Sequence, residues 1–461
     1  MSVNQLLEAP VHSRVPGPKD ERDIPLSEIV SALSFALDLT EGAVPGHALR
    51  SCLIGMKIAG ELGMSAEEQQ SLYYALLLKD AGCSSNAGRM CQIVGGDDRQ
   101  IKRDIKLQDW TKTSLGTLKV LWQNVLPDAN PVARAIRIIE MGMHQSENNA
   151  EMIQLRCDRG AQIALKIGLG EPTARAIRHL DEHWDGGGYP GSLRGTEIPL
   201  ASRIMALTQH LDAFASEQSE LAATTTLRER SGRWFDPELV KIVESLDRSR
   251  RLWSESGSDD QLRRVLDIAP ESGGTSVAQI DNVCEAFAEV VDAKSSFTYR
   301  HSAGVTQAAL KIAMQLGLSL ERRKLVWRAA LLHDVGKLGV SNSILDKPSK
   351  LNADEWSSVR MHPVNTQKIL ERIEPFAELA EVAGAHHEKL DGTGYPYGRT
   401  QDNLPLEARI IAVADVYGAL SEERPYRAAM SNDEVFAIMV KDVPDKLDAV
   451  CFEALKGSLG Y

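Results

Sequence analysis

The second half of the chain contains two stretches on which the fold assignment depends, HDVGK at residues 333–337 and HHEKLDGTGYP at residues 386–396. The first combines an imidazole and a carboxylate with Lys337, a cation suited to phosphate. The second begins with the pair His386 and His387 and ends in a glycine-rich bend. Imidazoles and carboxylates at this density are typical of a metal site.

Three further residues of the same half complete a candidate metal centre: His301, His362 and Asp415. A histidine–aspartate dipeptide arises by chance about once in a chain of this composition, so the dipeptide alone indicates little. A dinuclear centre needs imidazoles and carboxylates that converge from several helices, with one carboxylate between the ions. Asp334 is the natural candidate for that bridging position.

The order and spacing of these residues resemble the HD-GYP family, a branch of the HD phosphohydrolases. The similarity extends to the stretch RPYR at residues 424–427. It implies two sets of ligands that share Asp334: His301, His333, Asp334 and Asp415 for one ion, and Asp334, His362, His386 and His387 for the other. This mixed set suits iron or manganese, with zinc as an alternative, and it lacks the thiolates that favour structural zinc. Such ions lower the pKa of a water molecule, which favours in-line hydrolysis of a phosphodiester with Asp334 and Lys337 as catalytic residues.

Several residues are candidates for substrate binding. Lys337 follows Asp334 by three positions, so its ammonium group can face a phosphoryl oxygen. Arg424 and Arg427 are also three apart and would contact a second phosphate. In the bend, Gly394 permits close approach of the backbone to a ligand, and Tyr395, before Pro396, offers a stacking face. A ligand-facing role and a purely structural role are equally expected for Tyr395.

The resemblance implies a substrate that spacing alone does not define. HD-GYP proteins hydrolyse cyclic di-GMP to linear pGpG and in some members onward to GMP, and this is the reaction that we expect first. The first alternative is a phosphodiesterase for 3',3'-cyclic GMP-AMP, and the second is a non-catalytic receptor or scaffold for cyclic di-GMP. A generic phosphomonoesterase is a third. Diguanylate cyclases of the GGDEF type and a second copy of the chain are further candidate partners.

Two positions depart from the family pattern. Gly418 stands where the family commonly has an acidic residue, which puts the support of the metals or of Lys337 in doubt. Phe297 stands where members with three metals have a glutamate. We therefore expect two metal ions.

The chain also repeats itself. The spacing from His47 to Asp80 equals that from His301 to Asp334, an offset of 254 residues, while the DGGGYP stretch at 185–190 precedes the DGTGYP stretch at 391–396 by 206. The first copy therefore carries 48 extra residues, which we place near 84–146 as loop and added helix. Repeats of this length imply tandem domains.

The first copy lacks most of the candidate ligands. Lys79 stands in place of His333, Cys83 in place of Lys337 and Gln209 in place of Asp415. An ammonium group at a ligand position repels a cation, so we expect Lys79 to pair with Asp80. We predict that the first copy is not catalytic.

Apolar residues recur at helical spacing, as in residues 309–316 and 326–332, and predict an all-α chain of two tandem HD-GYP-like helical bundles joined by a linker. We expect a flexible tail at 1–25, a degenerate domain at 26–247, a linker at 248–276 that contains a short helix, and the intact catalytic domain at 277–461.

The 461 residues include 43% apolar residues and carry a net charge of −12, which disfavours binding to a nucleic-acid polymer. No signal sequence or long apolar run is apparent, so we expect a cytoplasmic protein without membrane attachment. The six cysteines show no Cys-x-x-Cys spacing, which indicates free thiols.

Overall fold

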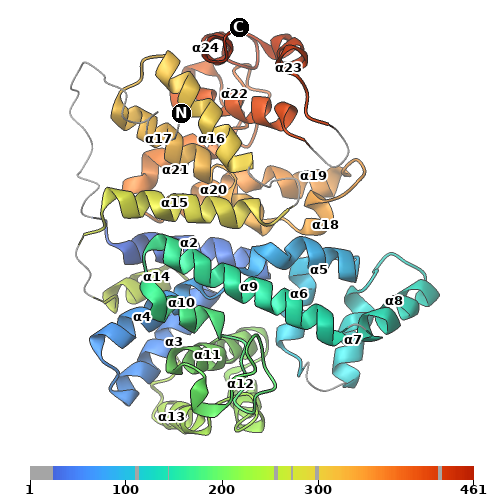
Figure 1. Ribbon diagram of the computed structural model, residues 1–461, viewed down its shortest axis with the longest axis vertical. Helices are drawn as coiled ribbons and strands as arrows, with labels where there is room; N and C mark the ends of the chain where they lie inside the picture. Colours follow the sequence, from blue (N-terminus) through green and yellow to red (C-terminus); the bar gives the residue numbers. More distant parts are fainter. Residues whose placement is uncertain are drawn as a thin grey trace. The chain divides into compact units, whose positions relative to one another are not determined.

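The computed structural model describes residues 24–109, 114–143, 145–253, 258–270, 274–295, 301–423 and 428–461. Within these residues the regular structure is helical, and the only extended pairings are two isolated bridges. This confirms the all-α prediction (Figure 1). Most of the predicted tail at 1–25 lies outside the described residues. None of the described helices combines the length and the apolar character needed to cross a membrane.

The chain forms two compact units, the first made mainly of Pro25–Thr275 and the second of Ser276–Val340 and Ile344–Tyr461. The helices of the first unit are α2 (Leu26–Glu41), α3 (His47–Leu62), α4 (Ala66–Leu78), η2 (Cys83–Asn86), α5 (Ala87–Val94), α6 (Asp98–Lys106), α7 (Leu115–Asn124), α8 (Pro131–Met143), α9 (Gln145–Ile167), α10 (Gly170–Arg178), η3 (Gly195–Glu197), α11 (Leu200–Glu217), α12 (Glu220–Glu229), α13 (Pro237–Arg248) and α14 (Ser258–Asp267).

The chain continues through α15 (Val277–Asp292), α16 (His301–Gln315), α17 (Leu320–Leu332), η4 (Val335–Gly339), α18 (Asn342–Leu345), α19 (Ala353–Arg360), α20 (His362–Leu370), η5 (Glu374–Phe376), α21 (Ala377–Gly384), η6 (Gln401–Asn403), α22 (Leu406–Ser421), α23 (Asn432–Met439), η7 (Val440–Asp442) and α24 (Ala449–Ser458). The exact domain boundaries named above stay predictions.

The two units repeat the same helix pairings. In the first unit α3 packs on α4 and α11, and α10 packs on α4 and α9. In the second unit α16 packs on α17 and α22, and α21 packs on α17 and α20. The helices α5 to α8 lie between these shared elements of the first unit, in the region where the sequence places its insertion.

Capping groups define where the helices begin. Ser319 starts α17 by accepting the Arg322 backbone N–H, and Ser65 starts α4 by accepting that of Glu68. These bonds satisfy amides that have no partner within the helix. Asn352 and Ser431 cap α19 and α23 in the same way, by accepting the backbone N–H groups of Glu355 and Glu434.

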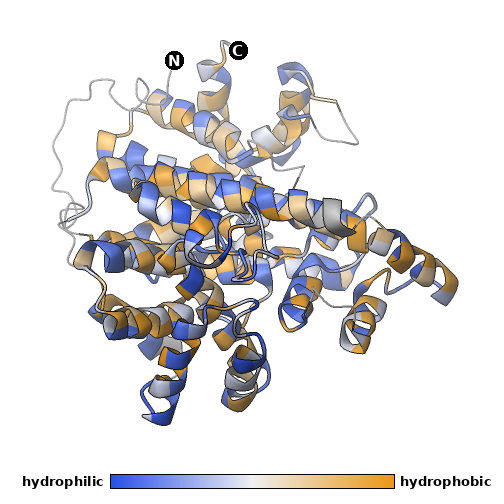
Figure 2. Ribbon diagram, turned by 60° about the horizontal axis from the view of Figure 1, so that its bottom comes forward, coloured by the Kyte–Doolittle hydropathy of each residue, from blue (hydrophilic) through white to orange (hydrophobic). Residues whose placement is uncertain are grey.

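Burial along α17 brings the HD dipeptide into the protein interior. The helix is enclosed on all sides from Val326 to Leu332, and His333 and Asp334 follow directly at its end. Hydrophobic and hydrophilic residues share most helices of both units, as Figure 2 shows, while the second half of α4, Leu72–Leu78, is enclosed in the same way as that of α17. Because every residue of this half of α17 is buried, the charged Arg328 included, His333 follows at the same depth and is 0% exposed.

Candidate metal centre

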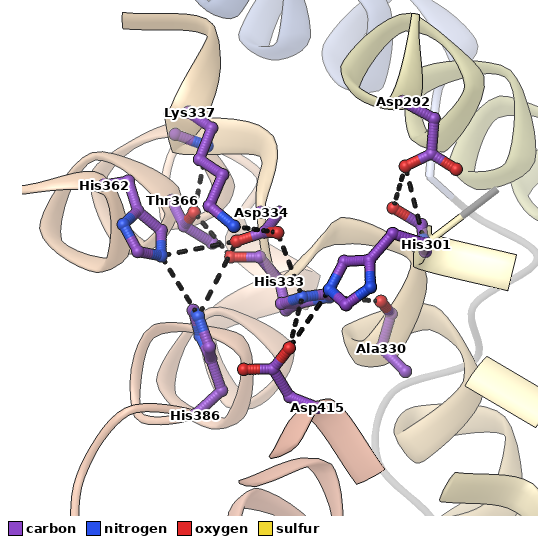
Figure 3. A network of polar contacts seen from close by, with 12 residues as sticks. Asp292, His301, Ala330, His333, Asp334, Lys337, His362, Thr366, His386 and Asp415 are labelled. Carbon is purple, nitrogen blue, oxygen red and sulfur yellow. Dashed lines mark hydrogen bonds and ion pairs between the residues drawn. The ribbon is translucent and has the colours of Figure 1, made fainter. Parts of the chain in front are cut away.

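The second unit brings the predicted ligands together from five helices and the segments that follow them. His301 begins α16, His333 and Asp334 end α17, His362 begins α20, His386 and His387 follow α21, and Asp415 lies in α22. Figure 3 shows the labelled members of this set around Asp334. All of the predicted ligands except His387 are buried.

Asp334 lies between two groups of imidazoles. Its Oδ2 is 3.3 Å from His333 Nε2, and its Oδ1 is 3.3 Å from His362 Nε2 and 3.8 Å from His386 Nε2. One carboxylate oxygen therefore faces each group, which is the arrangement that a bridging carboxylate requires.

Two further trios of potential ligand atoms flank Asp334. His301, His333 and Asp415 form the first, and His362, His386 and His387 form the second, with the atoms of each trio within 4.8 Å of one another. Asp415 connects the two trios, because its Oδ1 is 3.1 Å from His301 Nε2 and its Oδ2 is 3.7 Å from His387 Nδ1. Two cation positions about one shared carboxylate fit this geometry.

Three of the imidazoles are each fixed by the same kind of contact with a backbone carbonyl oxygen. The Nδ1 atoms of His333, His362 and His386 each lie 2.6 Å from the carbonyl oxygen three residues earlier. When Nδ1 donates to that carbonyl, Nε2 carries a lone pair and is directed into the centre. Such second contacts fix both the tautomer and the orientation of a metal-binding histidine.

The inward nitrogens have no suitable partner among the described residues. His362 Nε2 and His386 Nε2 are 3.2 Å apart, although neither carries a proton to donate when both Nδ1 atoms are protonated. His333 Nε2 and Asp334 Oδ1 are buried without a hydrogen-bond partner in the described part of the chain. Because buried lone pairs without a partner are costly, the arrangement fits bound cations.

In the metal-free protein, the electrostatics favour the metal-binding forms of His386, His387 and Asp334, whereas the neighbouring carboxylates raise the pKa values of His301 and His333. Burial, together with His387, holds the pKa of His386 well below its usual range, and burial followed by His362 lowers the pKa of His387 to about 3. Burial opposes ionisation of Asp334, but His333 and Lys337 outweigh it and hold its pKa well below the usual value. Neutral imidazoles around an ionised carboxylate are the forms that bind a metal.

Lys337 lies at the edge of the centre. Its Nζ is 2.5 Å from Asp334 Oδ2, and its side chain is 19% exposed. The ammonium group is thus both next to the shared carboxylate and accessible from outside. Arg424 and Arg427, the other predicted phosphate contacts, lie outside the described residues, as does Phe297.

Glu422 supports His301, a role that the sequence did not suggest. Its Oε2 is 2.9 Å from His301 Nδ1. A Cβ atom built on Gly418 would lie 3.6 Å from the His301 ring and 3.7 Å from Glu422 Oε1. Glu422 therefore supplies, from one turn later in the chain, the carboxylate that seemed to be missing at Gly418. Burial would lower the pKa of His301, but Asp415 and Glu422 outweigh it and raise the value to about 10.

The bend at Gly394, Tyr395 and Pro396 packs beside the centre. The ring centroids of Tyr395 and His387 are 4.8 Å apart. The Arg360 guanidinium also lies 4.8 Å from the centroid of the Tyr395 ring. Gly394 permits this packing, because a Cβ atom there would lie 2.4 Å from the Lys389 nitrogen. Arg360 was not predicted; its only signal in the sequence is its position two residues before His362.

A glutamate at the equivalent position holds this bend in each unit. Glu388 accepts the backbone N–H groups of Tyr397 and Arg399 at 2.6 and 3.0 Å. In the first unit Glu182 accepts those of Gly191 and Leu193 at the same two distances. The bend thus has one construction, whether or not a metal centre lies beside it.

The first unit does not reproduce the centre in its described residues. Lys79 and Asp80 form a buried ion pair, as predicted, and His47 Nδ1 lies 2.6 Å from Asp212 Oδ2. His183, near the bend of this unit, stacks on Trp234 with ring centroids 4.3 Å apart. The ammonium group of Lys79 thus occupies the position that the candidate ligand His333 has in the second unit.

Comparison with known proteins agrees with this geometry. The family model described as "HD domain" matches residues 137–239 and 285–450. The chain is 44% identical over 441 residues, 95% of each sequence, to a protein of Vibrio cholerae named 3'3'-cGAMP-specific phosphodiesterase 3. It is 36% identical over 66% of its length, and 73% of the relative, to the V. cholerae 3'3'-cGAMP-specific phosphodiesterase 1.

Two further similarities concern a solved structure and a shorter match. A crystal structure titled as a cyclic GMP-AMP-specific phosphodiesterase of V. cholerae, V-cGAP3, aligns with a TM-score of 0.65 at 40% identity over 94% of this chain and 97% of that one. The cyclic di-GMP phosphodiesterase response regulator RpfG of Xanthomonas campestris is 41% identical over 31% of this chain and 39% of its own. The chain therefore belongs to the HD domain family and is related to the HD-GYP phosphodiesterases of cyclic dinucleotides.

Proposed function

We propose that the chain is a metal-dependent phosphodiesterase that hydrolyses 3'3'-cGAMP at the centre around Asp334. The observation that carries this proposal is the 44% identity over 95% of both sequences to a relative named for that substrate. The sequence alone placed cyclic di-GMP first and 3',3'-cyclic GMP-AMP as the alternative; the full-length relative supports the alternative better.

The centre is proposed to hold two ions, iron or manganese. Asp334 would be the shared ligand, with His301, His333 and Asp415 on one side and His362, His386 and His387 on the other. The inward lone pairs of His362 and His386, 3.2 Å apart, support this assignment. When bound, such ions lower the pKa of water and offset charge on a phosphoryl group.

The residues of the chain would orient the substrate. Lys337, which already lies beside Asp334, offers an ammonium group to a phosphoryl oxygen and would offset the charge that grows on it during hydrolysis. Tyr395 offers a ring for stacking on a base, and Arg360 on that ring adds positive charge on the same side. Arg424 and Arg427 remain predicted contacts of the second phosphate.

Cyclic di-GMP is the second candidate, because shorter relatives such as RpfG are named for it at 41% identity. A non-catalytic receptor or scaffold is the third. The inward orientation of all seven candidate ligands favours catalysis over that role.

A matched pair of substitutions tests the proposal. Purified protein loaded with Mn²⁺ or Fe²⁺ is incubated with 3'3'-cGAMP or cyclic di-GMP, and the products are separated by chromatography. Asp334→Asn should abolish hydrolysis, while Asp80→Asn, the same change at the corresponding position of the first unit, should retain it. Faster hydrolysis of cyclic di-GMP would reject the substrate, and full activity of Asp334→Asn would reject the site.

A further inference from the structure

The first unit contains a cavity of about 370 Å³, within the range of about 300–1,000 Å³ that is typical of small-molecule sites. Residues of α5, α6, α7 and α8, together with α2, α9 and α11, form its wall. Figure 1 shows α5 to α8 as the helices that extend this unit. The cavity therefore lies where the first copy departs from the second.

Most of the wall is apolar. The satellite core of the added helices, Val94, Ile101 and Val125, is packed by partly buried hydrophobic side chains that also line the cavity, including Met90, Ile105, Leu121, Ile138 and Met141. Leu118 on α7 lines the cavity and is 45% exposed. These helices bury one another only in part, and the remaining apolar surface faces the cavity.

Charged side chains gather in another part of the wall, beside the position where the second unit has its metal centre. Lys106 Nζ is 2.7 Å from Glu41 Oε2 and 3.9 Å from Asp80 Oδ1, and Lys102 Nζ is 3.4 Å from Glu41 Oε1. Arg156 forms an ion pair with Asp181. Asp80 itself is neutralised by Lys79.

The charges that line the cavity do not balance. The lining residues include three cationic side chains, Lys102, Lys106 and Arg156, but only two carboxylates, Glu41 and Asp181. Each of these cations contacts a carboxylate, and with the adjoining Lys79–Asp80 pair the group has four cations and three carboxylates, a surplus of one positive charge in a partly enclosed, mainly apolar space. A ligand with a single negative charge would compensate it.

Two other occupants fit less well. Glu41, Asp80 and Cys83 could group around a metal ion, but Lys79 and Lys106 lie against the same carboxylates and would repel it. A cyclic dinucleotide carries two phosphate charges against one surplus cation, and its polar edges would face an apolar wall.

We propose that this cavity is a binding site for a monoanionic amphiphile, a molecule with one anionic head group and an apolar body. The head group lies beside Lys106 and Arg156, where the first copy has lost its metal ligands. The apolar body lies among Met90, Leu121, Ile138 and Met141. The degenerate unit would thus have a ligand of its own, different from the substrate of the second unit.

Direct binding to the full chain tests this proposal. Isothermal titration calorimetry compares dodecanoate with dodecyl phosphate, neutral dodecanol and cationic dodecyltrimethylammonium, all below their micellar concentrations. We expect dodecanoate to bind at least about tenfold more tightly than dodecanol, and the cationic probe not to bind. Dodecyl phosphate, measured beside dodecanoate, shows whether a carboxylate or a phosphate head is preferred. Equal affinity for the anionic and neutral probes, or no binding up to about 1 mM, overturns the proposal.

Two pairs of variants locate the site. Ile138→Trp fills the cavity and should weaken dodecanoate binding by about tenfold or more, while Ile136→Trp, on the 52% exposed side of the same helix, should not. Lys106→Met should weaken dodecanoate but not dodecanol, and Lys119→Met, exposed on α7, serves as its control.

Circular dichroism and the thermal midpoint establish that each variant is folded. Unchanged dodecanoate binding in folded Ile138→Trp would overturn the location, and displacement of dodecanoate by 3'3'-cGAMP would overturn the ligand class. Neither result depends on whether the second unit hydrolyses 3'3'-cGAMP.

Discussion

Gly336, between the HD dipeptide and Lys337, provides a sharp test of the site. A Cβ atom at this position would lie 2.0 Å from the His362 carbonyl oxygen and 2.7 Å from the Thr366 nitrogen. Both neighbours are backbone atoms of α20, so no side-chain rotation can relieve the contact. In Gly336→Ala, α20 would have to retreat by about 1.4 Å to reach an ordinary separation of 3.4 Å.

That movement would displace His362 relative to Asp334. It would also strain a connection in which Gly336 donates to Thr366 Oγ1 and the Thr366 hydroxyl donates to the His333 carbonyl oxygen, at 3.0 and 2.9 Å. Displacements of about 1 Å cost roughly 100-fold in activity, and such overpacking costs about 1–3 kcal/mol of stability. We expect both losses in Gly336→Ala, together with a lower metal content.

The assay combines the rate of 3'3'-cGAMP hydrolysis, metal analysis of the purified protein and thermal unfolding. Gly457→Ala is the matched control, because its nearest contact is an ordinary 3.4 Å to Gln315 Nε2. Wild-type kcat/KM and metal content in Gly336→Ala would show that α20 does not hold a ligand in the way described.

Three other predictions concern support, metal and pH. Glu422→Gln should weaken Mn²⁺ binding by about 10–100-fold, because it removes the carboxylate 2.9 Å from His301 Nδ1; unchanged affinity in a metal titration would contradict this role. Removal of metal with a chelator should abolish hydrolysis and lower the thermal midpoint, and Mn²⁺ or Fe²⁺ should restore both; sustained activity in the chelator would argue against a metal centre. Burial, opposed by Lys79, raises the pKa of Asp38 to about 7. The folded state therefore binds this proton more tightly than the unfolded state, so Asp38 contributes stability below about pH 4 that is lost as the pH rises towards 7, by up to about 1.4 kcal/mol per pH unit. Denaturation of Asp38→Asn across this range should show a smaller pH dependence than wild type, and identical slopes would disprove the shift.

Much of the fold and centre followed from sequence because the relevant signals are local. Helical periodicity in residues 309–316 and 326–332 predicts the helices that the structure has as α16 and α17. The repeated spacing from His47 to Asp80 and from His301 to Asp334 predicts two units of one design.

Other features depend on the reach of side chains across the fold. Glu422 compensates for Gly418 only because α22 ends with its last turn beside His301. The cavity exists because the apolar side chains of α5 to α8 bury one another only in part. The periodicity of the sequence predicts the helices but not how closely they pack. The choice between two cyclic dinucleotides is likewise not contained in the ligand set, since both present the same phosphodiester to it.

The shared bracing of the bend by Glu388 and Glu182 has a consequence for recognising active members in genomes. A Gly-Tyr-Pro signature reports that a carboxylate anchors a loop, and this mechanical requirement persists in a copy that has exchanged its histidines for other residues. Surveys that count this tripeptide will therefore include copies that lack the candidate metal ligands together with copies that have them. The residues just before it, a histidine pair here and Leu180 with Asp181 in the first copy, are the more informative marker of chemistry.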